Sequence, residues 1–401
     1  MKVKVLNKAF ALALAWCLLT QVSPVMAGDE STSKPPAGSI FRVVATPNEN
    51  FNNALFAASA SSPNDIWAVG DSTIHFDGTK WTAFPAPMIG QDLNGFQGVV
   101  DISPTLAWAV GNVSVNFGSP TQVIEQWNGT RWSVFPGPTF APNDQPLLFA
   151  ATAASADDIW AVGVLGVDGV MDELLFENFD GSSWTAATAP DPGDGFLFGA
   201  SADAINDVWA VGYNGTTDTN AKGITEHFDG TSWESVPSAI VDDNRGTNQL
   251  TAVAALAPND VWAVGNSIPV VNPQTAASLT LIEHFDGTSW SVVPSPNVGP
   301  HSVAQNNNLL GITAVSATDI YAFGRVMAAD GSGQQSTLVL HWNGTSWSLI
   351  PSPSPVKGTF RSDLLFAGVT PAPGNVWLFG DQNIVDTLAL HTLTGDSLSK
   401  E

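Results

Sequence analysis

The chain of 401 residues carries 37 acidic and 13 basic residues, which gives a formal net charge of −24, and it contains a single cysteine. A surface this acidic repels nucleic acid and anionic lipid, so nucleic acid is excluded from the expected partners. The only cysteine, Cys17, lies in a predicted export signal. The mature domain is therefore expected to have no disulfide and no thiolate chemistry.

The first 27 residues have the pattern of an export signal. A basic start precedes an apolar stretch, residues 9–20, and Val25-Met26-Ala27 offers the residue types that suit cleavage before Gly28. The apolar stretch is short for a membrane span, so we expect a secreted or extracytoplasmic protein without membrane insertion after cleavage. Residues 28–38 combine Ser, Thr, Pro and charged residues, which predicts a disordered leader.

Residues 39–392 repeat one pattern seven times without a linker between the copies. The core of the pattern reads W-A-V-G, and successive copies start 41 to 59 residues apart. The anchor positions are Trp67, Trp108, Trp160, Trp209, Trp262, Tyr321 and Trp377. A period near 50 residues is typical of blades or solenoid turns, each too small to bury its own apolar face. The pattern predicts one repeat domain, followed by a tail at residues 393–401.

The fifth copy shows the predicted content of one blade most clearly. Four segments rich in β-branched and aromatic residues are separated by turn signals, and none has a helical period. The predicted strands are residues 251–255, 261–264, 279–285 and 290–293. Asp286-Gly287 joins the outer pair, and this dipeptide predicts a tight hairpin in which both residues take positive φ.

Two features favour a closed ring over an open solenoid. Ten residues before every anchor the chain has only Ala or Gly, as expected where inner strands converge on a crowded axis. The last copy lacks an outermost strand, and residues 41–48 match residues 290–297 of the fifth copy. The sequence therefore predicts an all-β fold, a seven-bladed β-propeller with four antiparallel strands per blade, in which an N-terminal strand completes the last blade.

On these motifs the chain resembles the bacterial secreted β-propellers built from W-A-V-G and W-(D/N)-G-T-x-W repeats. More distantly it is similar to the Asp-box and photosystem-assembly-factor propellers, which also place an Asp-Gly turn before a Trp. Asp77-Gly78 lacks the spacer residue that is usual in the Asp box, and kelch and WD signatures are absent. Such propellers include lectins, hydrolases and assembly factors, so the resemblance implies the fold and not one function.

Most polar and aromatic residues that invite a chemical role recur at fixed repeat positions, which indicates a structural role. The recurring histidines are His75, His227, His284, His341 and His391, expected to form structural hydrogen bonds. The recurring glutamates are Glu125, Glu177, Glu226 and Glu283, expected to be solvated cross-strand partners. The Trp residues that begin the outermost strands are expected to pack between blades, with a sugar-stacking platform as the alternative.

Function is expected where the copies differ, in the loops that share one face of the ring. Basic residues gather there in blades four to seven, although they are rare in the chain. The candidate ligand-binding residues are Arg245, His301, Arg325, Arg361, Tyr213 and Asp363. The three arginines would suit a carboxylate or sulfate held by bidentate contacts. The favoured interpretation, however, is that each arginine pairs with a nearby acid such as Asp242, Asp243, Asp330 or Asp363, so that the anion site is the alternative.

The predicted function is that of a secreted, monomeric, non-catalytic propeller that recognises a glycan or an extracytoplasmic protein. No catalytic triad, paired-acid motif or metal motif stands apart from the repeat. The alternative is a sialidase-like or lyase-like enzyme acting on an acidic glycan, in which the arginines hold a carboxylate and Tyr213 or an acid performs the chemistry. No cofactor is predicted, although the acidic loop at residues 168–173 hints at calcium without a known ligand spacing.

Overall fold

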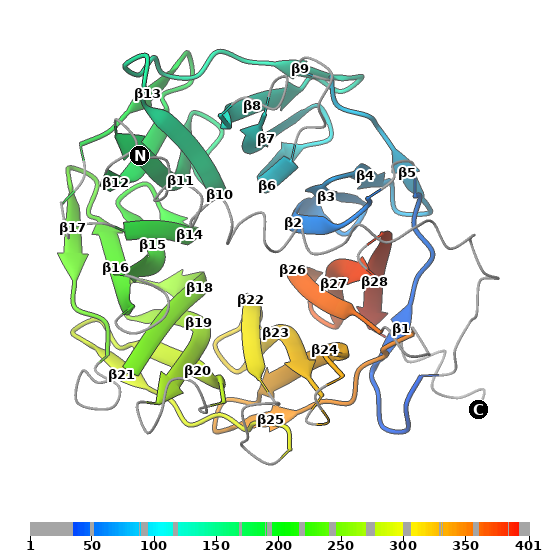
Figure 1. Ribbon diagram of the computed structural model, residues 1–401. Coiled ribbons are helices and arrows are strands. Elements are labelled where there is room, and N and C mark those ends of the chain that lie inside the picture. Colours follow the sequence, from blue (N-terminus) through cyan, green and yellow to red (C-terminus); the bar gives the residue numbers. More distant parts are fainter. Residues whose placement is uncertain are drawn as a thin grey trace.

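The structure is a computed structural model (Figure 1). It describes residues 35–48, 52–87, 89, 95–114, 119–167, 171–188, 190, 195–215, 221–239, 246–269, 277–299, 306–328, 330, 332–355, 361–383 and 385–392. The predicted export signal and the C-terminal tail lie outside these residues. Of the predicted leader only residues 35–38 are described, and they form a turn in which the Ser39 amide donates to the Pro36 carbonyl at 2.9 Å. Within the described residues there is no helix with the length and hydropathy needed to cross a membrane.

The described residues form seven four-stranded antiparallel sheets around a common axis, so the predicted seven-bladed propeller is confirmed (Figure 1). In each blade the longest strands lie nearest the axis and a short strand lies outermost. Blades 1 and 2 comprise β2 (Leu55–Ser62), β3 (Asp65–Gly70), β4 (Thr73–Phe76) and β5 (Trp81–Ala83), then β6 (Gly95–Ser103), β7 (Leu106–Val113), β8 (Thr121–Trp127) and β9 (Trp132–Val134). Blades 3 and 4 comprise β10 (Gln145–Ser155), β11 (Asp158–Val167), β12 (Met171–Phe179) and β13 (Trp184–Ala186), then β14 (Gly195–Ala204), β15 (Asp207–Asn214), β16 (Lys222–Phe228) and β17 (Trp233–Val236).

Blades 5 and 6 comprise β18 (Gly246–Ala257), β19 (Asp260–Pro269), β20 (Leu279–Phe285) and β21 (Trp290–Val292), then β22 (Asn307–Ser316), β23 (Asp319–Met327), β24 (Gln335–Trp342) and β25 (Trp347–Leu349). Blade 7 comprises β26 (Asp363–Ala372), β27 (Asn375–Gln382), β28 (Asp386–Thr392) and, from the other end of the chain, β1 (Phe41–Val43). The outer strands of blade 5 match the prediction closely. Its two inner strands are longer than predicted because their polar ends also pair, up to Gly246 opposite Pro269.

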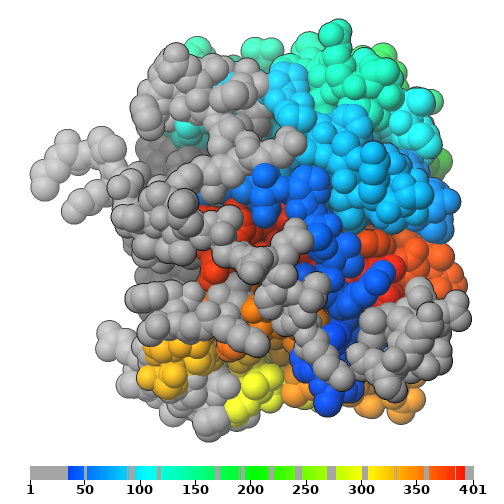
Figure 2. Space-filling view, turned by 90° about the vertical axis from the view of Figure 1, so that its right-hand side faces the viewer, coloured from blue at the N-terminus to red at the C-terminus, as the bar shows by residue number. Residues whose placement is uncertain are grey.

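The ring is closed by the N-terminal strand, as predicted. β1 pairs antiparallel to β28, with Phe41 opposite Thr392 and Val43 opposite Leu390. Beyond the strand, the Asn48 side-chain oxygen accepts a hydrogen bond from the Thr387 amide at 2.9 Å. Figure 2 shows the blue N-terminal segment lying against the red segment near the other end of the chain. This pairing covers the edge that the last sheet would otherwise expose.

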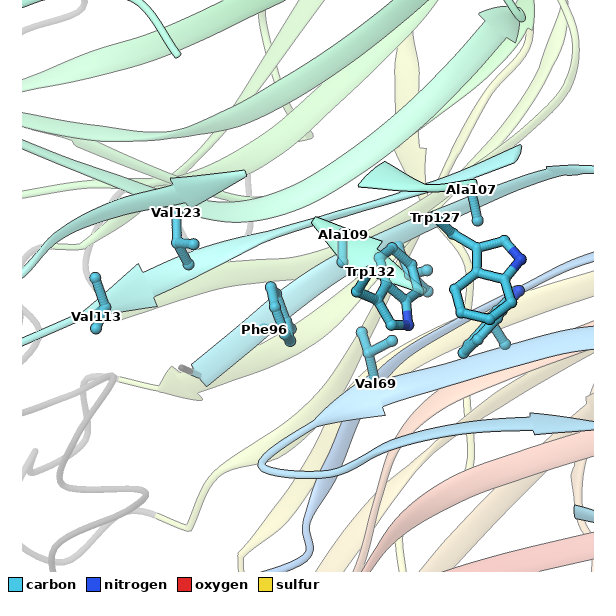
Figure 3. Packing of buried hydrophobic residues seen from close by; sticks show 10 residues of the cluster. Val69, Phe96, Ala107, Ala109, Val113, Val123, Trp127 and Trp132 are labelled. Carbon is cyan, nitrogen blue, oxygen red and sulfur yellow. The ribbon is translucent and has the colours of Figure 1, made fainter. Parts of the chain in front are cut away.

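Aromatic contacts between neighbouring blades form much of the core. The anchor Trp67 of blade 1 packs edge-on against Trp132, the first residue of the outermost strand of blade 2, with ring centroids 4.9 Å apart. Val69 of blade 1 and Phe96 of blade 2 join the same cluster (Figure 3). The corresponding pairs are Trp108–Trp184, Trp160–Trp233, Trp209–Trp290, Trp262–Trp347 and Trp377–Trp81. The outer-strand Trp residues are therefore core residues, as predicted.

The glycine of W-A-V-G serves a close approach between the first two strands of a blade. A Cβ at Gly70 would lie 2.1 Å from the Ala54 carbonyl oxygen, which no side chain tolerates. At this level the innermost strand of every blade has a bulge. The bulged residue directly precedes the Ala or Gly that lies ten residues before the anchor. The bulged residues are Phe56, Gln97, Phe149, Phe198, Thr251, Leu310 and Phe366. A bulge turns a side chain out of the regular alternation of the strand.

The outer hairpin differs from the predicted tight turn. Only the glycine has positive φ, for example +90° at Gly287, whereas the preceding Asp286 does not. The Asp286 carboxylate instead accepts hydrogen bonds from the amides of Thr288 and Ser289, at 2.9 and 3.0 Å. These bonds lower the pKa of Asp286. The expectation of two residues with positive φ was wrong, because the side chain of the aspartate stabilises a four-residue loop in their place.

Candidate functional site

The recurring histidines are structural, as predicted. His227 Nε2 lies 2.8 Å from the Asp207 carboxylate, which also accepts a hydrogen bond from the Trp209 indole at 2.9 Å. The imidazole of His227 stacks on the same indole with centroids 4.4 Å apart. The equivalent pairs are His75–Asp65, His284–Asp260, His341–Asp319 and His391–Asn375. These side chains serve the scaffold in five of the blades.

The recurring glutamates were predicted to be solvated, and this prediction was wrong. All four have an exposed fraction of 0%. Glu283 accepts hydrogen bonds from Ser238 Oγ at 2.9 Å and the Ala239 amide at 3.0 Å, both in the preceding blade. Burial raises the pKa of Glu283 to about 7, that of Glu226 to about 7 and that of Glu177 to about 8. The position faces the neighbouring blade, as the apolar residues of the other copies indicate. Those residues are Ile74, Leu340 and Leu390.

One repeat position changes its chemistry from blade to blade. It is the fourth residue after each anchor, next to the invariant glycine and near the end of the second strand. Its occupants are Asp71, Asn112, Val164, Tyr213, Asn266, Arg325 and Asp381. The position lies on the face where the innermost strands begin, since Asp381 is opposite Leu364 near the start of β26. We call this face the variable face.

Blades 6, 7 and 1 contribute a charged sector to the variable face. We define it as Arg325, Arg361, Asp363, Asp381 and Asp71. Two adjacent residues of β24 hold the two arginines, because Arg325 Nη1 donates to Gln335 Oε1 at 2.5 Å and Arg361 Nη2 donates to Ser336 Oγ. Both guanidinium groups are thus fixed at the start of one strand.

Two carboxyl groups of the charged sector, those of Asp363 and Asp381, are buried, and all three lie close enough for Asp363 and Asp71 to influence Asp381. Asp363 is 0% exposed and Asp381 is 6% exposed. Burial, together with the nearby Asp363 and Asp71, raises the pKa of Asp381 to about 8, while Arg325 opposes the shift. Burial also raises the pKa of Asp71 to about 6. In the opposite direction, burial lowers the pKa of Arg325, and the charge of Asp381 partly offsets this effect.

Blades 3 and 4 contribute an aromatic sector. We define it as Leu147, Phe149, Val164, Phe196, Phe198 and Tyr213. Phe198 stacks on Phe149 with centroids 5.2 Å apart and on Tyr213 with centroids 5.3 Å apart. Tyr213 is 4% exposed, and burial raises its pKa to about 12. The phenol of Tyr213 is therefore buried and protonated at neutral pH, and such a group is unsuited to act as a nucleophile.

The predicted ligand-binding residues divide into three groups. Arg325, Arg361 and Asp363 come together in the charged sector, whereas Tyr213 belongs to the aromatic sector. Arg245 and His301 lie outside the described residues, as do residues 168–170 of the acidic loop. In the part of the chain that the structure describes, no group of three or more His, Cys, Asp or Glu residues is arranged to hold a metal ion.

Sequence reasoning missed two parts of the variable face. The first is Asp381, the acid that lies near Arg325, because the two belong to different blades. The second is the pair Phe149 and Phe198 at the bulged positions. A signal for the phenylalanines was available, since Phe occupies the position eleven residues before the anchor in four copies.

The comparisons with known proteins identify the fold. No family model and no curated protein matches the chain. Among solved structures, YCF48 bound to D1 peptide is similar with a TM-score of 0.54, 11% identity and coverage of 90% of this chain and 97% of that one. YCF48 from Cyanidioschyzon merolae is similar with a TM-score of 0.52, 16% identity and coverage of 88% and 98%. The WD40 β-propeller domain of Doa1 is similar with a TM-score of 0.53, 10% identity and coverage of 90% and 99%.

Sequence identities of 10–16% show that these proteins share the fold, and nothing more. The chain is a seven-bladed β-propeller, and the expected distant similarity to the assembly-factor class is confirmed for the fold. Membership of the bacterial secreted propellers stays a prediction. Function must therefore be argued from the variable face.

Proposed function

We propose that the protein is a secreted, non-catalytic binding propeller whose variable face recognises a segment of another protein. The observation that carries the proposal is the change in chemistry at the fourth position after the anchor. The neighbouring repeat residues, such as Trp209 and Gly265, are constrained by packing and are nearly uniform among the copies. A position that varies from blade to blade while its neighbours stay nearly uniform is typical of a ligand-binding surface.

The contents of the variable face favour a polypeptide over a neutral glycan. The aromatic sector suits an apolar side chain, and the charged sector suits an ionic group of the same ligand. A protein segment carries both kinds of group. The YCF48 structure with D1 peptide is precedent for a peptide ligand on a propeller of this fold. A glycan remains the alternative ligand, and the experiment below separates the two.

The test uses the exported protein and three variants. Phe198→Ala reduces the aromatic sector, Arg361→Ala removes a charge from the charged sector, and Val292→Ser changes a side chain that is 44% exposed on the outer strand β21. Crosslinking in the extracytoplasmic fraction of the source cells, followed by mass spectrometry, identifies bound proteins. We expect one protein to be captured by the wild type and by Val292→Ser, and lost with the other two variants.

A glycan array with the same four proteins decides the alternative. Glycan binding that disappears with Phe198→Ala, without any captured protein, would replace the proposed protein ligand by a sugar. Capture that is equal for all four proteins would show that the variable face is not the binding surface. Thermal unfolding of each variant checks that the loss of binding does not reflect loss of the fold.

A further inference from the structure

We infer that the charged sector binds a carboxylate group of the ligand and that this binding takes up protons, so that affinity decreases as the pH rises. The inference rests on the proposed function, because it assumes that the variable face is the binding surface. It adds the chemical group that the sector recognises and the condition that controls its recognition.

The balance of charge within the sector depends on the protonation of its acids. Two guanidinium groups, on Arg325 and Arg361, lie among three carboxyl groups, on Asp71, Asp363 and Asp381. With every group ionised the net charge is negative, and a carboxylate would be repelled. With Asp71 and Asp381 protonated the net charge is positive even if Asp363 stays ionised. The sector attracts an anion only in the second state.

The arginines of the sector have hydrogen-bonding capacity that suits a carboxylate. A guanidinium has five N–H donors, and paired donors suit a carboxylate. The buried Nε of Arg361 has no hydrogen-bond partner among the described residues. Because Ser336 engages Nη2 of the same group, the guanidinium is held in place while part of its donor edge is unused. A carboxylate oxygen is the type of partner that this edge lacks.

The acids are the groups of the sector that titrate between mild acid and mild alkali. Facing Arg325 from its own blade are neutral side chains, Asn308 on β22 and Thr337 on β24. Asp381 of blade 7 lies near Arg325, and Asp363 of blade 7 and Asp71 of blade 1 lie near Asp381. The pKa of about 8 at Asp381 and of about 6 at Asp71 places the change of charge between mild acid and mild alkali.

Because binding and protonation are linked, this arrangement predicts a measurable change of binding affinity with pH. A bound carboxylate disfavours the ionised form of a neighbouring acid, so the acid takes up a proton on binding. Uptake of one proton changes the affinity by about tenfold for each pH unit over the range in which the acid titrates. Between about pH 5.5 and about pH 8 we therefore expect the affinity to fall by at least about tenfold.

The experiment uses a carboxylate probe and its neutral counterpart. N-acetyl-phenylalanine carries an aromatic ring and a carboxylate, and N-acetyl-phenylalaninamide lacks only the charge. Isothermal titration calorimetry at the two pH values, in two buffers of different ionisation enthalpy, gives the dissociation constant and the number of protons taken up. We expect the acid to bind more tightly at the lower pH and to take up about one proton when it binds at the higher pH, whereas the amide should show neither effect.

Variants locate the effect in the charged sector. Asp381→Asn should bind the acid at the higher pH nearly as well as at the lower pH, and Asp71→Asn provides a second variant in case the first does not fold. Glu283→Gln removes a buried acid of another interface and should leave the slope unchanged. Arg361→Ala should weaken binding of the acid at both pH values.

Two results would overturn the inference while the proposed function stands. One is an affinity for the acid that is equal at both pH values or greater at the higher pH. The other is absence of detectable binding of the acid by a protein whose natural partner is still captured through the variable face. Equal capture of the partner by the wild type and by the variable-face variants would instead contradict the proposed function itself.

Discussion

The interface between blades 4 and 5 and the interface between blades 6 and 7 have the same edge-on aromatic geometry but use different residues. In the first, Trp209 meets Trp290 edge-on, with centroids 5.4 Å apart and an interplanar angle of 87°. In the second, Tyr321 meets Phe41 at 6.0 Å and 84°. β21 follows β20 directly in the chain, whereas β1 reaches β28 from the opposite end. The last blade therefore depends on packing to hold its outermost strand, whereas the outermost strand of every other blade is also connected through the chain to the strand beside it.

The polar contacts beyond the outermost strand are also shared. Asn297 accepts a hydrogen bond from the Thr280 amide at 2.9 Å in blade 5, and Asn48 accepts one from the Thr387 amide at 2.9 Å in blade 7. Both asparagines follow a proline at matching sequence positions. The closing segment therefore reproduces a complete repeat element, including the bonds that fix the chain after the strand.

The largest expected effect comes from removing the aromatic ring at each interface. Phe41→Ala and Trp290→Ala should each lower the free energy of unfolding by about 3–5 kcal/mol, measured by chemical denaturation, because both rings are buried in the core. Hydrogen exchange should separate the two variants. The Val44 amide, which donates to the Ala389 carbonyl at 2.9 Å, should exchange freely in Phe41→Ala.

The matching amide is that of Val293, which donates to the Ile282 carbonyl at 2.9 Å. It should keep more protection in Trp290→Ala, because a hairpin connects its strand to the neighbouring strand. Equal loss of protection at Val293 and Val44 would contradict the view that β1 depends on side-chain packing more strongly than β21 does.

The second effect concerns the buried acids, which both regions contain. The pKa of Glu283 is about 7 in the folded protein and near 4.5 when the chain is unfolded. Its contribution to stability is therefore fully present below about pH 4.5 and is lost as the pH rises through 7. Asp381 at the other interface acts in the same direction up to about pH 8. The propeller should be most stable in mild acid.

Glu283→Gln tests this expectation by chemical denaturation near pH 4.5, 6 and 8. At the highest pH the variant should be more stable than the wild type by a few kcal/mol, and the difference should vanish toward pH 4.5. Asp286→Asn serves as the control, because the pKa of this exposed turn residue is lowered and its effect has the opposite sign. A stability curve for Glu283→Gln that parallels the wild-type curve would refute the assignment of a buried, protonated glutamate.

The repeat explains why so much of the fold could be predicted. Residues 41–48 were matched to residues 290–297 by alignment of copies, and this match alone gives the pairing of β1 with β28. The small residues before each anchor indicated a crowded axis, and a Cβ at Gly311 would indeed lie 2.7 Å from the Phe366 carbonyl oxygen of the next blade. One prediction was wrong although the repeat contained the relevant information. Glu283 was expected in solvent, although the equivalent Leu340 indicates a buried position.

The candidate site could be predicted only in part, for two physical reasons. Bulges break the alternation by which strand residues are assigned to a face, so the orientation of Phe149 and Phe198 was not evident. Contacts between blades join residues far apart in the chain, and no local pattern connects Arg325 to Asp381. The prediction placed Arg325, Arg361 and Asp363 on one face but could not assign their neighbours.

The smallest effect should come from the asparagines that follow the outermost strands. Asn48→Ala and Asn297→Ala each remove a hydrogen bond to a backbone amide, at a cost of about 1 kcal/mol. Asn48 also donates to Asp386 at 3.1 Å and contacts the Thr387 hydroxyl at 3.0 Å, so its loss should cost slightly more.

Double-mutant cycles then measure how far each asparagine depends on its aromatic neighbour. Once Phe41 is replaced by Ala the closing segment is no longer held, and Asn48→Ala should cost almost nothing further. Trp290→Ala leaves β21 tethered by its hairpin, so Asn297→Ala should keep most of its cost. Equal coupling energies in the two cycles would mean that connectivity contributes nothing, because the closing segment would then behave as any other outermost strand.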